Sequence, residues 1–330
     1  MSHYPLADNL FADDVASEPI RAGFGRGLKM AGQADESVVA LCADLTDSTK
    51  MSEFKEAFPE RFVEIGVAEQ NLVTVASGMA RAGKIPFTSS YAAFSPGRNW
   101  EQIRTTIALN DQPVKIVGSH AGVSVGPDGA THQMLEDIAL MRVLPNMIVV
   151  APGDSVEAEK ATQAIAKNGK PTYLRLAREK TPVFSTPDSP FELGKAYVLR
   201  EGNDISLLGT GTMTYQLLAA AKQLEQHGIN AEVVHVPTIK PLDDDTILAS
   251  VRKTGRALSA EEAQIKGGFG GAIAELLAEQ LPTPLKRIGM QDRFGESGNP
   301  DELLDHFGLT GAKIAESAKQ FIDVTPQYHQ

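Results

Sequence analysis

The amino-acid sequence predicts an α/β protein of two three-layer αβα domains, each built on a mostly parallel sheet. The first observation is that short apolar segments alternate with longer amphipathic ones along nearly the whole chain. The second is that the short segments are apolar at consecutive positions, which is typical of strands buried on both faces of a parallel sheet. The third is the length of 330 residues, which suits about two domains.

The domain boundary is predicted where proline, serine and threonine concentrate. Residues 181–190 contain three prolines, two serines and two threonines, a composition typical of a linker. We therefore expect an N-terminal arm over residues 1–17, a first domain over 18–182, a linker over 183–193 and a smaller second domain over 194–330.

Each element of the first domain follows from its local sequence. Strands are expected in apolar runs at Val38–Leu45, Arg61–Val67, Ile85–Ser90, Val114–Ser119, Met147–Ala151 and Pro171–Leu176. Helices are expected between them at Ile20–Gly32, Asn71–Ala82, Arg98–Asn110, Glu136–Val143 and Ser155–Asn168. Pro19 suits the start of the first helix, and Ser155 is the expected N-cap of the last.

The second domain repeats the alternation on a smaller scale. Its expected strands are Ile205–Leu208, Glu232–Val236, Arg256–Ala260 and Leu285–Ile288. Its expected helices follow Thr212 up to His227 and then occupy Asp243–Arg252, Gly268–Gln280, Pro300–Phe307 and Thr310–Phe321. Gly209-Thr210-Gly211 is half of a dinucleotide-binding fingerprint, and an ordinary turn explains it as well.

Composition argues against some classes of partner. The formal net charge is −11, whereas nucleic acids and anionic membranes need a basic face, so we expect neither as a partner. The acidic N-terminal segment does not resemble a signal peptide, and no apolar stretch is long and uninterrupted enough to span a membrane. Cys42 is the only cysteine and lies in an expected strand, which fits a core residue in a reducing cytoplasm.

Glu69 lies between a predicted strand and a helix that the sequence predicts to be buried. An ionised carboxylate is costly to remove from water, so this side chain should be paired, neutralised or used in chemistry. The alternative is an acid at a helix N-terminus that the helix dipole favours.

Two further segments carry candidate binding groups. Tyr91 and Phe94 follow a strand end three residues apart, a spacing that suits either core packing or a clamp for a planar ring. Residues 118–133 form a glycine-rich loop at the carboxyl end of a strand, where open α/β sheets bind ligands. This loop contains His120, Asp128 and His132. Its histidine spacing is poor for a metal, and it lacks the lysine of a P-loop.

Together these segments resemble the C-terminal half of a transketolase, and the resemblance covers nearly the whole chain. That half comprises a pyrimidine-binding domain for thiamine diphosphate and a smaller transketolase C-terminal domain, which would be the two expected domains. The segments that match the family's motifs, in order, are Asp44–Ser48, Gly66–Glu69, Tyr91 with Phe94, Gly126–Gln133 and Leu176–Arg178. The departures are Gly97 in place of a third aromatic, Ala121 where Asp is frequent after the histidine, and Ala130 in place of proline.

The resemblance implies a role for each matched residue. Glu69 would be catalytic by hydrogen-bonding a pyrimidine nitrogen of thiamine diphosphate, and the other cofactor-binding residues would be Asp44, Tyr91 and Phe94. His132 would be the second catalytic residue and would also reach the hydroxyls of the sugar. The remaining substrate-binding residues would be Arg21, Ser48, His120, Asp128 and Arg178.

The sequence lacks the diphosphate-binding half of the family, which has Gly-Asp-Gly followed by a metal-ligating asparagine. The resemblance therefore implies a partner, an N-terminal transketolase subunit that carries this half and the Mg²⁺ ligands, with no metal ligand on this chain. Two copies of each subunit would form a transferase that moves a two-carbon ketol unit between phosphorylated sugars. The alternatives are the beta subunit of a 2-oxo acid dehydrogenase, a deoxyxylulose phosphate synthase-like enzyme, or a noncatalytic subunit of the same fold.

Overall fold

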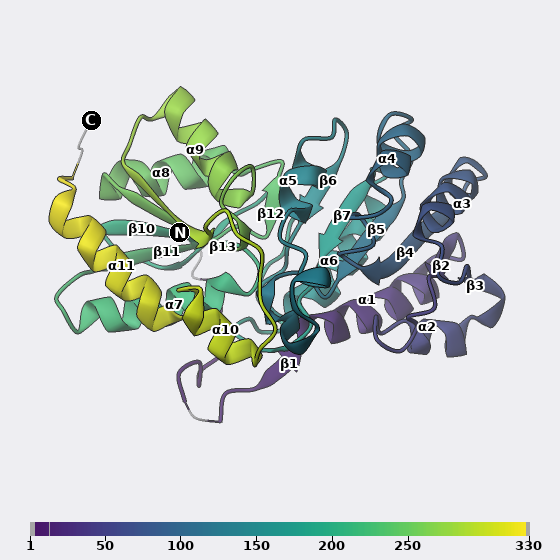
Figure 1. Ribbon diagram of the computed structural model, residues 1–330, viewed down its shortest axis with the longest axis horizontal. Helices are drawn as coiled ribbons and strands as arrows, with labels where there is room; N and C mark the ends of the chain where they lie inside the picture. The colour runs from purple at the N-terminus through teal and green to yellow at the C-terminus, as the bar shows by residue number, and fades with distance from the viewer. Residues whose placement is uncertain (1–3, 13, 328–330) are drawn as a thin grey trace.

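A seven-stranded sheet organises the first domain in the computed structural model, which describes residues 4–12 and 14–327 (Figure 1). The strand order is β12-β6-β7-β5-β4-β2-β3, and all neighbours run parallel except β12 and β6. The strands that the first domain contributes are β2 (Val38–Cys42), β3 (Phe62–Glu64), β4 (Ile85–Tyr91), β5 (Lys115–Ser119), β6 (Ile148–Val150) and β7 (Thr172–Arg175). Each lies within or nearly within a predicted strand.

Helices cover both faces of this sheet and bury separate apolar clusters. On one face lie α1 (Ile20–Ala34), α2 (Ser52–Ala57) and α6 (Ser155–Lys167), with a short 3-10 turn at Pro59–Arg61. On the other lie α3 (Glu69–Arg81), α4 (Trp100–Gln102), which continues as a π-helix over Ile103–Ala108, and α5 (Asp137–Arg142). In the segment predicted as a helix over Arg98–Asn110, Ile103 and Ile107 are buried.

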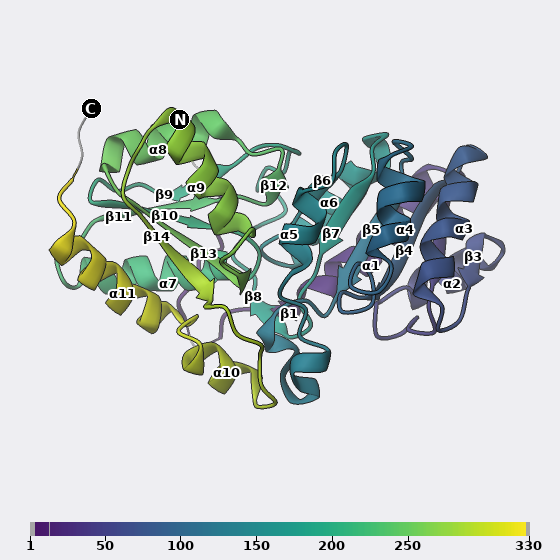
Figure 2. The ribbon, with the colours of Figure 1, turned by 45° about the horizontal axis from the view of Figure 1, so that its top comes forward.

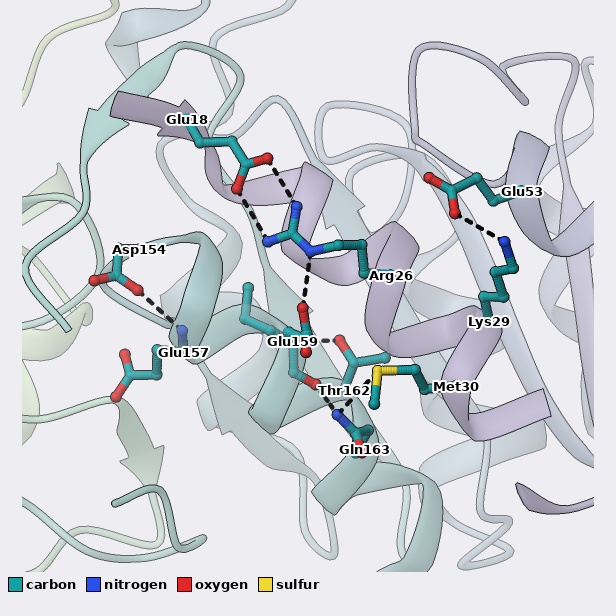
Figure 3. A network of polar contacts seen from close by, with 11 residues as sticks. Glu18, Arg26, Lys29, Met30, Glu53, Asp154, Glu157, Glu159, Thr162 and Gln163 are labelled. Carbon is teal, nitrogen blue, oxygen red and sulfur yellow. Dashed lines mark hydrogen bonds and ion pairs between the residues drawn. The ribbon is translucent and has the colours of Figure 1, made fainter. Parts of the chain in front are cut away.

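Helices α1 and α6 pack closely because glycine lines α1. A Cβ at Gly23 would lie 1.8 Å from the Ser155 carbonyl oxygen, so no larger residue fits there. Polar contacts fix the same pair of helices (Figure 3). Arg26 donates to both carboxylate oxygens of Glu18, at 2.7 and 3.0 Å, and to Glu159 Oε2 at 2.8 Å. The guanidinium of Arg26 lowers the pKa of Glu18 through these bonds.

The second domain is built on a five-stranded sheet within the described residues, in the order β14-β13-β10-β11-β9. Only β9 runs antiparallel to its neighbour. The strands are β9 (Tyr197–Arg200), β10 (Ile205–Gly209), β11 (Ala231–His235), β13 (Ala257–Gln264) and β14 (Leu285–Met290). Around them lie α7 (Met213–Glu225), α8 (Asp244–Thr254), α9 (Phe269–Gln280), α10 (Pro300–His306) and α11 (Gly311–Val324) (Figures 1 and 2).

The two domains are joined more closely than the linker composition suggests. Strand β12 (Thr238–Lys240) comes from the second domain yet pairs antiparallel with β6 of the first sheet. Just before the linker, β8 (Lys180–Pro182) pairs with β1 (Ser17–Pro19). One apolar cluster continues from the face of the first sheet under α3 and α5 to the face of the second sheet under α8 and α9.

The described part of the predicted N-terminal arm is an ordered extension. Tyr4 and Leu10 are buried in the apolar cluster under α7, and the Ala7 N–H donates to the Phe184 carbonyl at 2.9 Å. Residues 1–3 and 13 of the arm, and residues 328–330 of the second domain, lie outside the described residues.

Two local expectations are wrong in detail. Asp154, not Ser155, is the N-cap of α6, and its Oδ1 accepts from the Glu157 N–H at 2.9 Å. The helix predicted from Arg98 begins at Trp100, since Arg98 still lies in a turn in which its N–H bonds the Phe94 carbonyl. The glycine-rich loop contains short 3-10 turns over Val123–Thr131, interrupted where two glycines adopt positive φ.

Candidate active site

Several predicted site residues lie along the carboxyl edge of the first sheet. Glu69 follows β3, Tyr91 ends β4, His120 follows β5 and Arg178 follows β7. Strands β7, β5, β4, β2 and β3 are neighbours in that order, so their ends lie side by side. This edge is where open α/β sheets bind their ligands.

Glu69 is buried with one of its two carboxylate oxygens free to accept a hydrogen bond. The residue is only 2% exposed, and its Oε1 accepts from Ser90 Oγ at 3.2 Å. Its Oε2 is buried without a hydrogen-bond donor in the described structure, and the nearest cationic atom, Arg98 Nη1, is 3.7 Å away. Asn99 Nδ2 fixes the Glu69 main chain by donating to its carbonyl oxygen at 2.8 Å. The orphaned oxygen is an acceptor for a group that enters the site.

Four rings lie close together beside this carboxylate. The Tyr91 and Phe94 rings are stacked, with centroids 6.2 Å apart and an interplanar angle of 21°. The His120 ring stacks on Tyr91 at 3.9 Å, and the His132 ring meets Phe94 edge-on at 5.5 Å. One face of Tyr91 is therefore covered by His120. Arg98 links the rings to the carboxylate, because its guanidinium also lies 5.1 Å from the Phe94 ring centroid.

A basic group of two arginines adjoins the rings. Arg21 Nη1 donates to the Arg178 carbonyl at 2.8 Å, whereas Arg21 Nε is buried without an acceptor in the described structure. Arg178 Nη1 donates to the Val125 carbonyl at 2.6 Å and lies 3.9 Å from Asp128 Oδ2. Burial, together with the charges of the two arginines and His132, lowers the pKa of His120 to about 3. His120 is therefore neutral at physiological pH, and the positive charges here are those of the arginines.

Asp44 and Ser48 lie in the turn after β2, the strand that pairs with β4. Asp44 is exposed with φ +59°, and its N–H donates to Glu64 Oε1 at 2.7 Å. Ser48 is half-buried. Over the described ranges, no hydrogen bond or ion pair joins either residue to the other predicted site residues.

Sequence reasoning missed the residues that hold the predicted site residues in place. Arg98 and Ser90, which contact Glu69, were not identified as candidates, although both lie close to Tyr91 and Phe94 in the sequence. Glu64 holds the turn after β2 by accepting from the Asp44 and Gly66 N–H groups. Glu262, in the second domain, accepts a hydrogen bond from Ser124 in the loop that carries Asp128. The two residues are 138 positions apart in the sequence. No local signal could have identified that contact.

Within residues 4–12 and 14–327 there is no group of three or more His, Cys, Asp or Glu side chains arranged to hold a metal ion. None of the helices in the same ranges is long and apolar enough to cross a membrane.

Comparison with known proteins identifies the family. Residues 18–183 match the model of the transketolase pyrimidine-binding domain, and residues 194–314 match that of the transketolase C-terminal domain. The chain belongs to the transketolase family. The resemblance inferred from the motifs is thus confirmed, as is the α/β fold of two domains with mostly parallel sheets.

Individual transketolase relatives align over most of their own length. A putative transketolase C-terminal section of Methanocaldococcus jannaschii is 43% identical over 300 residues, which are 90% of this chain and 94% of the relative. A 6-deoxy-6-sulfo-D-fructose transketolase subunit of Clostridium sp. is 42% identical, covering 87% and 89%. A solved split gene transketolase, described as an inactive beta4 tetramer, is 42% identical with a TM-score of 0.88, over 93% and 99% of the two chains. The chain is therefore similar to the C-terminal part of transketolases that are divided between polypeptides.

Proposed function

We propose that this chain is the C-terminal subunit of a split transketolase, which transfers a two-carbon ketol unit between phosphorylated sugars with thiamine diphosphate. The observation that carries the proposal is the buried, orphaned Oε2 of Glu69 beside the Tyr91 and Phe94 rings. Such a site suits a heteroaromatic ring that carries a hydrogen-bond donor. The ring could stack on Tyr91 and Phe94 while its donor bonds the free carboxylate oxygen.

The residues present fit the pyrimidine end of thiamine diphosphate. Phe94 and the open face of Tyr91 would hold the ring, and Glu69 Oε2 would share a proton with a ring nitrogen while Ser90 keeps Oε1 in place. Asp44 would lie near the cofactor on the neighbouring strand end. When bound, the cofactor supplies a nucleophilic carbon for attack on the sugar carbonyl. The protein's own contribution is to orient that ring and to hold the proton at Glu69.

The basic group would bind the sugar phosphate. Arg21 has a buried N–H without an acceptor, and its pKa is lowered by burial and by the charge of Arg178, so an anion would relieve both costs. His120 and Ser48 would complete this subsite, while Asp128 and His132 would reach the hydroxyls of the sugar. One relative is named for a sulfonated sugar, and the same arginines could hold a sulfonate. The donor and acceptor are thus sugars with an anionic terminus.

We further propose that the subunit acts only with a partner that carries the diphosphate-binding domain and the Mg²⁺ ligands. The relatives described as a C-terminal section, as a subunit and as an inactive beta4 tetramer support this proposal. The exposure of Val67 and Arg98 also supports it. Both residues lie close to Glu69, and a partner subunit could cover them. Two copies of each subunit would form the active assembly.

Reconstitution tests the proposal. The purified chain is expected to bind thiamine diphosphate weakly and to transfer no ketol unit, whereas an equimolar mixture with the partner, a chain of roughly 300 residues, should convert xylulose 5-phosphate and an aldose phosphate. Tight cofactor binding and turnover by the chain alone would refute the need for a partner. Release of CO₂ from pyruvate by the complex, without ketol transfer, would favour the decarboxylating alternatives instead.

A further inference from the structure

The loop that carries Asp128 and His132 is held at its beginning by a carboxylate of the second domain. Glu262 lies in β13 and is 2% exposed. Its Oε1 accepts from the Ser124 N–H at 2.7 Å, and its Oε2 accepts from Thr212 Oγ1 at 2.8 Å. Both oxygens are therefore occupied, one by the loop and one by the start of the second domain's first helix.

The loop backbone is shaped to receive this carboxylate. Gly122 has φ +92°, and a Cβ there would lie 2.3 Å from Glu262 Oε1, so any larger residue would push the loop and the carboxylate apart. The strand that carries Glu262 is itself fixed to the first domain. The Glu262 carbonyl accepts from Arg175 Nη2 at 2.8 Å, and Arg175 forms a buried ion pair with Asp137 at 2.8 Å.

The end of the same loop is also held by the second domain. Gln133 is 4% exposed, and its Nε2 donates to the carbonyl oxygens of Val123 at 3.0 Å and Glu296 at 2.8 Å. Helix α10 packs against the turns between these two contacts (Figure 2). The segment between Ser124 and Gln133 is therefore held at both ends by the second domain. Glu262 holds its beginning, and the bond from Gln133 to the Glu296 carbonyl holds its end.

We propose that Glu262 is a positioning residue for sugar binding, and that the second domain contributes to the site by holding this loop. The inference rests on the proposed function, because Asp128 and His132 matter only if they meet a sugar. A hydrogen bond to a buried carboxylate is stronger than one between neutral groups, and the two positive-φ glycines within the turns give the loop little rigidity of its own. Losing Glu262 should therefore release the loop and leave Glu69 and the ring pair unaffected.

Hydrogen exchange on the free chain tests the contact without any activity. In Glu262→Ala, amides of residues 122–133 should exchange at least about tenfold faster, as expected for the loss of a charge-assisted bond. Glu262→Gln should stay within about threefold of wild type, since the amide can still accept from Ser124 and donate to the Thr212 hydroxyl. The matched control is Glu261→Gln on the same strand, since Glu261 bonds the Phe269 and Gly270 N–H groups instead. It should change exchange at the start of α9 and not in the loop.

A second variant keeps the test decisive if Glu262→Ala does not fold. Gly122→Ala displaces the loop from the carboxylate and leaves the second domain's core intact, so it should give the same local increase in exchange. In the reconstituted complex, either variant should raise KM for the sugar phosphate about tenfold, with kcat and thiamine diphosphate affinity within about twofold of wild type. Unchanged exchange in the loop, or an equal increase throughout the second domain, would overturn the inference. Absence of ketol transfer by the wild-type complex would instead refute the proposed function, while the exchange data would still decide the role of Glu262.

Discussion

Glu69 shows how one side chain can be both fixed and available. Its Oε1 is held by Ser90, its main chain is held by Asn99, and its Oε2 has no donor. Arg98 stands 3.7 Å away and is 56% exposed, so its charge is screened by water and its contact is too long for a hydrogen bond. A carboxylate that served only as a helix N-terminal acid would accept from the backbone N–H groups of α3, and Glu69 makes no such bond within the described structure. This geometry favours the chemical role over the structural alternative.

Substitution of Glu69 tests whether the chain is a catalytic or a noncatalytic subunit. Glu69→Gln keeps the shape of the side chain and removes its capacity to hold and release a proton. We expect at least about a hundredfold loss of kcat in the reconstituted complex, the range for general acid–base groups. The control is Glu101→Gln, which changes an exposed carboxylate on α4 and should leave the rate at the wild-type level. An unchanged rate in Glu69→Gln would mean that the chain is not a catalytic subunit.

His120 makes stability depend on pH. Its folded-state pKa is about 3 and its unfolded value is about 6.5, so the unfolded chain binds more protons between these values. The contribution of neutral His120 is fully present above pH ~6.5 and is lost as pH falls, by about 2 kcal/mol at pH 5. Urea unfolding of the free chain should therefore show a smaller loss of stability between pH 7.5 and 5 in His120→Gln than in wild type.

The matched control for His120 is His227→Gln, because His227 is exposed beyond the end of α7. This variant should retain the pH dependence of the wild type. If His120→Gln and wild type lost the same stability on acidification, the assignment of a neutral, buried His120 would be wrong.

At the scale of elements, the sequence predicts a helix or strand well where residues near one another in the chain determine it. Apolar periodicity gave the positions of β4, β5, α1 and α9 to within a residue or two. The failures occur where a contact between distant residues decides. The strands β2 and β3 end earlier than predicted, at Cys42 and Glu64, and beyond these ends the Glu64 carboxylate accepts from the Asp44 and Gly66 N–H groups. Nothing in the sequence around Glu64 indicates that bond.

The site follows the same rule. Motif resemblance pointed to Glu69, Tyr91 and His120, which the structure places at the carboxyl edge of the first sheet, because their types and spacing match the family's motifs. It did not identify the residues that hold them, such as Arg98 and Glu262. Those supporting contacts depend on how the chain folds back, and a single sequence carries no direct record of it.

The N-cap of α6 illustrates an element whose strength depends on tertiary contacts. Asp154 accepts from the Glu157 N–H and also from the Phe184 and Ser185 N–H groups, at 3.0 and 2.7 Å. It therefore ties the helix to the segment that leads into the second domain. A serine cap at position 155 could not make these bonds.

We expect Asp154→Ala to lower the free energy of unfolding by about 3 kcal/mol or more, because it leaves several buried N–H groups without acceptors. Ser155→Ala should cost less than about 1 kcal/mol, since this residue is not the cap. Urea denaturation of the two variants at pH 7 measures the difference. Equal losses would contradict the assignment of Asp154 as the cap.

At the scale of the whole molecule, the two domains have a sheet and an apolar cluster in common. Strand β12 of the second domain completes the first sheet, and one apolar cluster runs beneath both sheets. A buried contact between Glu157 Oε2 and His235 Nε2, at 2.7 Å, joins α6 to β11, and His235 Nδ1 lies 2.7 Å from Thr214 Oγ1. His235 is thus a structural residue of the interface between the domains.

This shared structure predicts that the chain unfolds as one cooperative unit despite its two domains. Separating the domains would expose the continuous apolar cluster and break the β12–β6 pairing, so neither domain should survive the unfolding of the other. A protease site introduced at Pro187–Asp188, which are exposed in the linker, allows a direct test. After cleavage the two fragments should remain associated on gel filtration, and near-UV and far-UV circular dichroism should report a single coincident transition. Fragments that separate without denaturant, or two resolved transitions in the uncut chain, would show that the linker divides two independent domains.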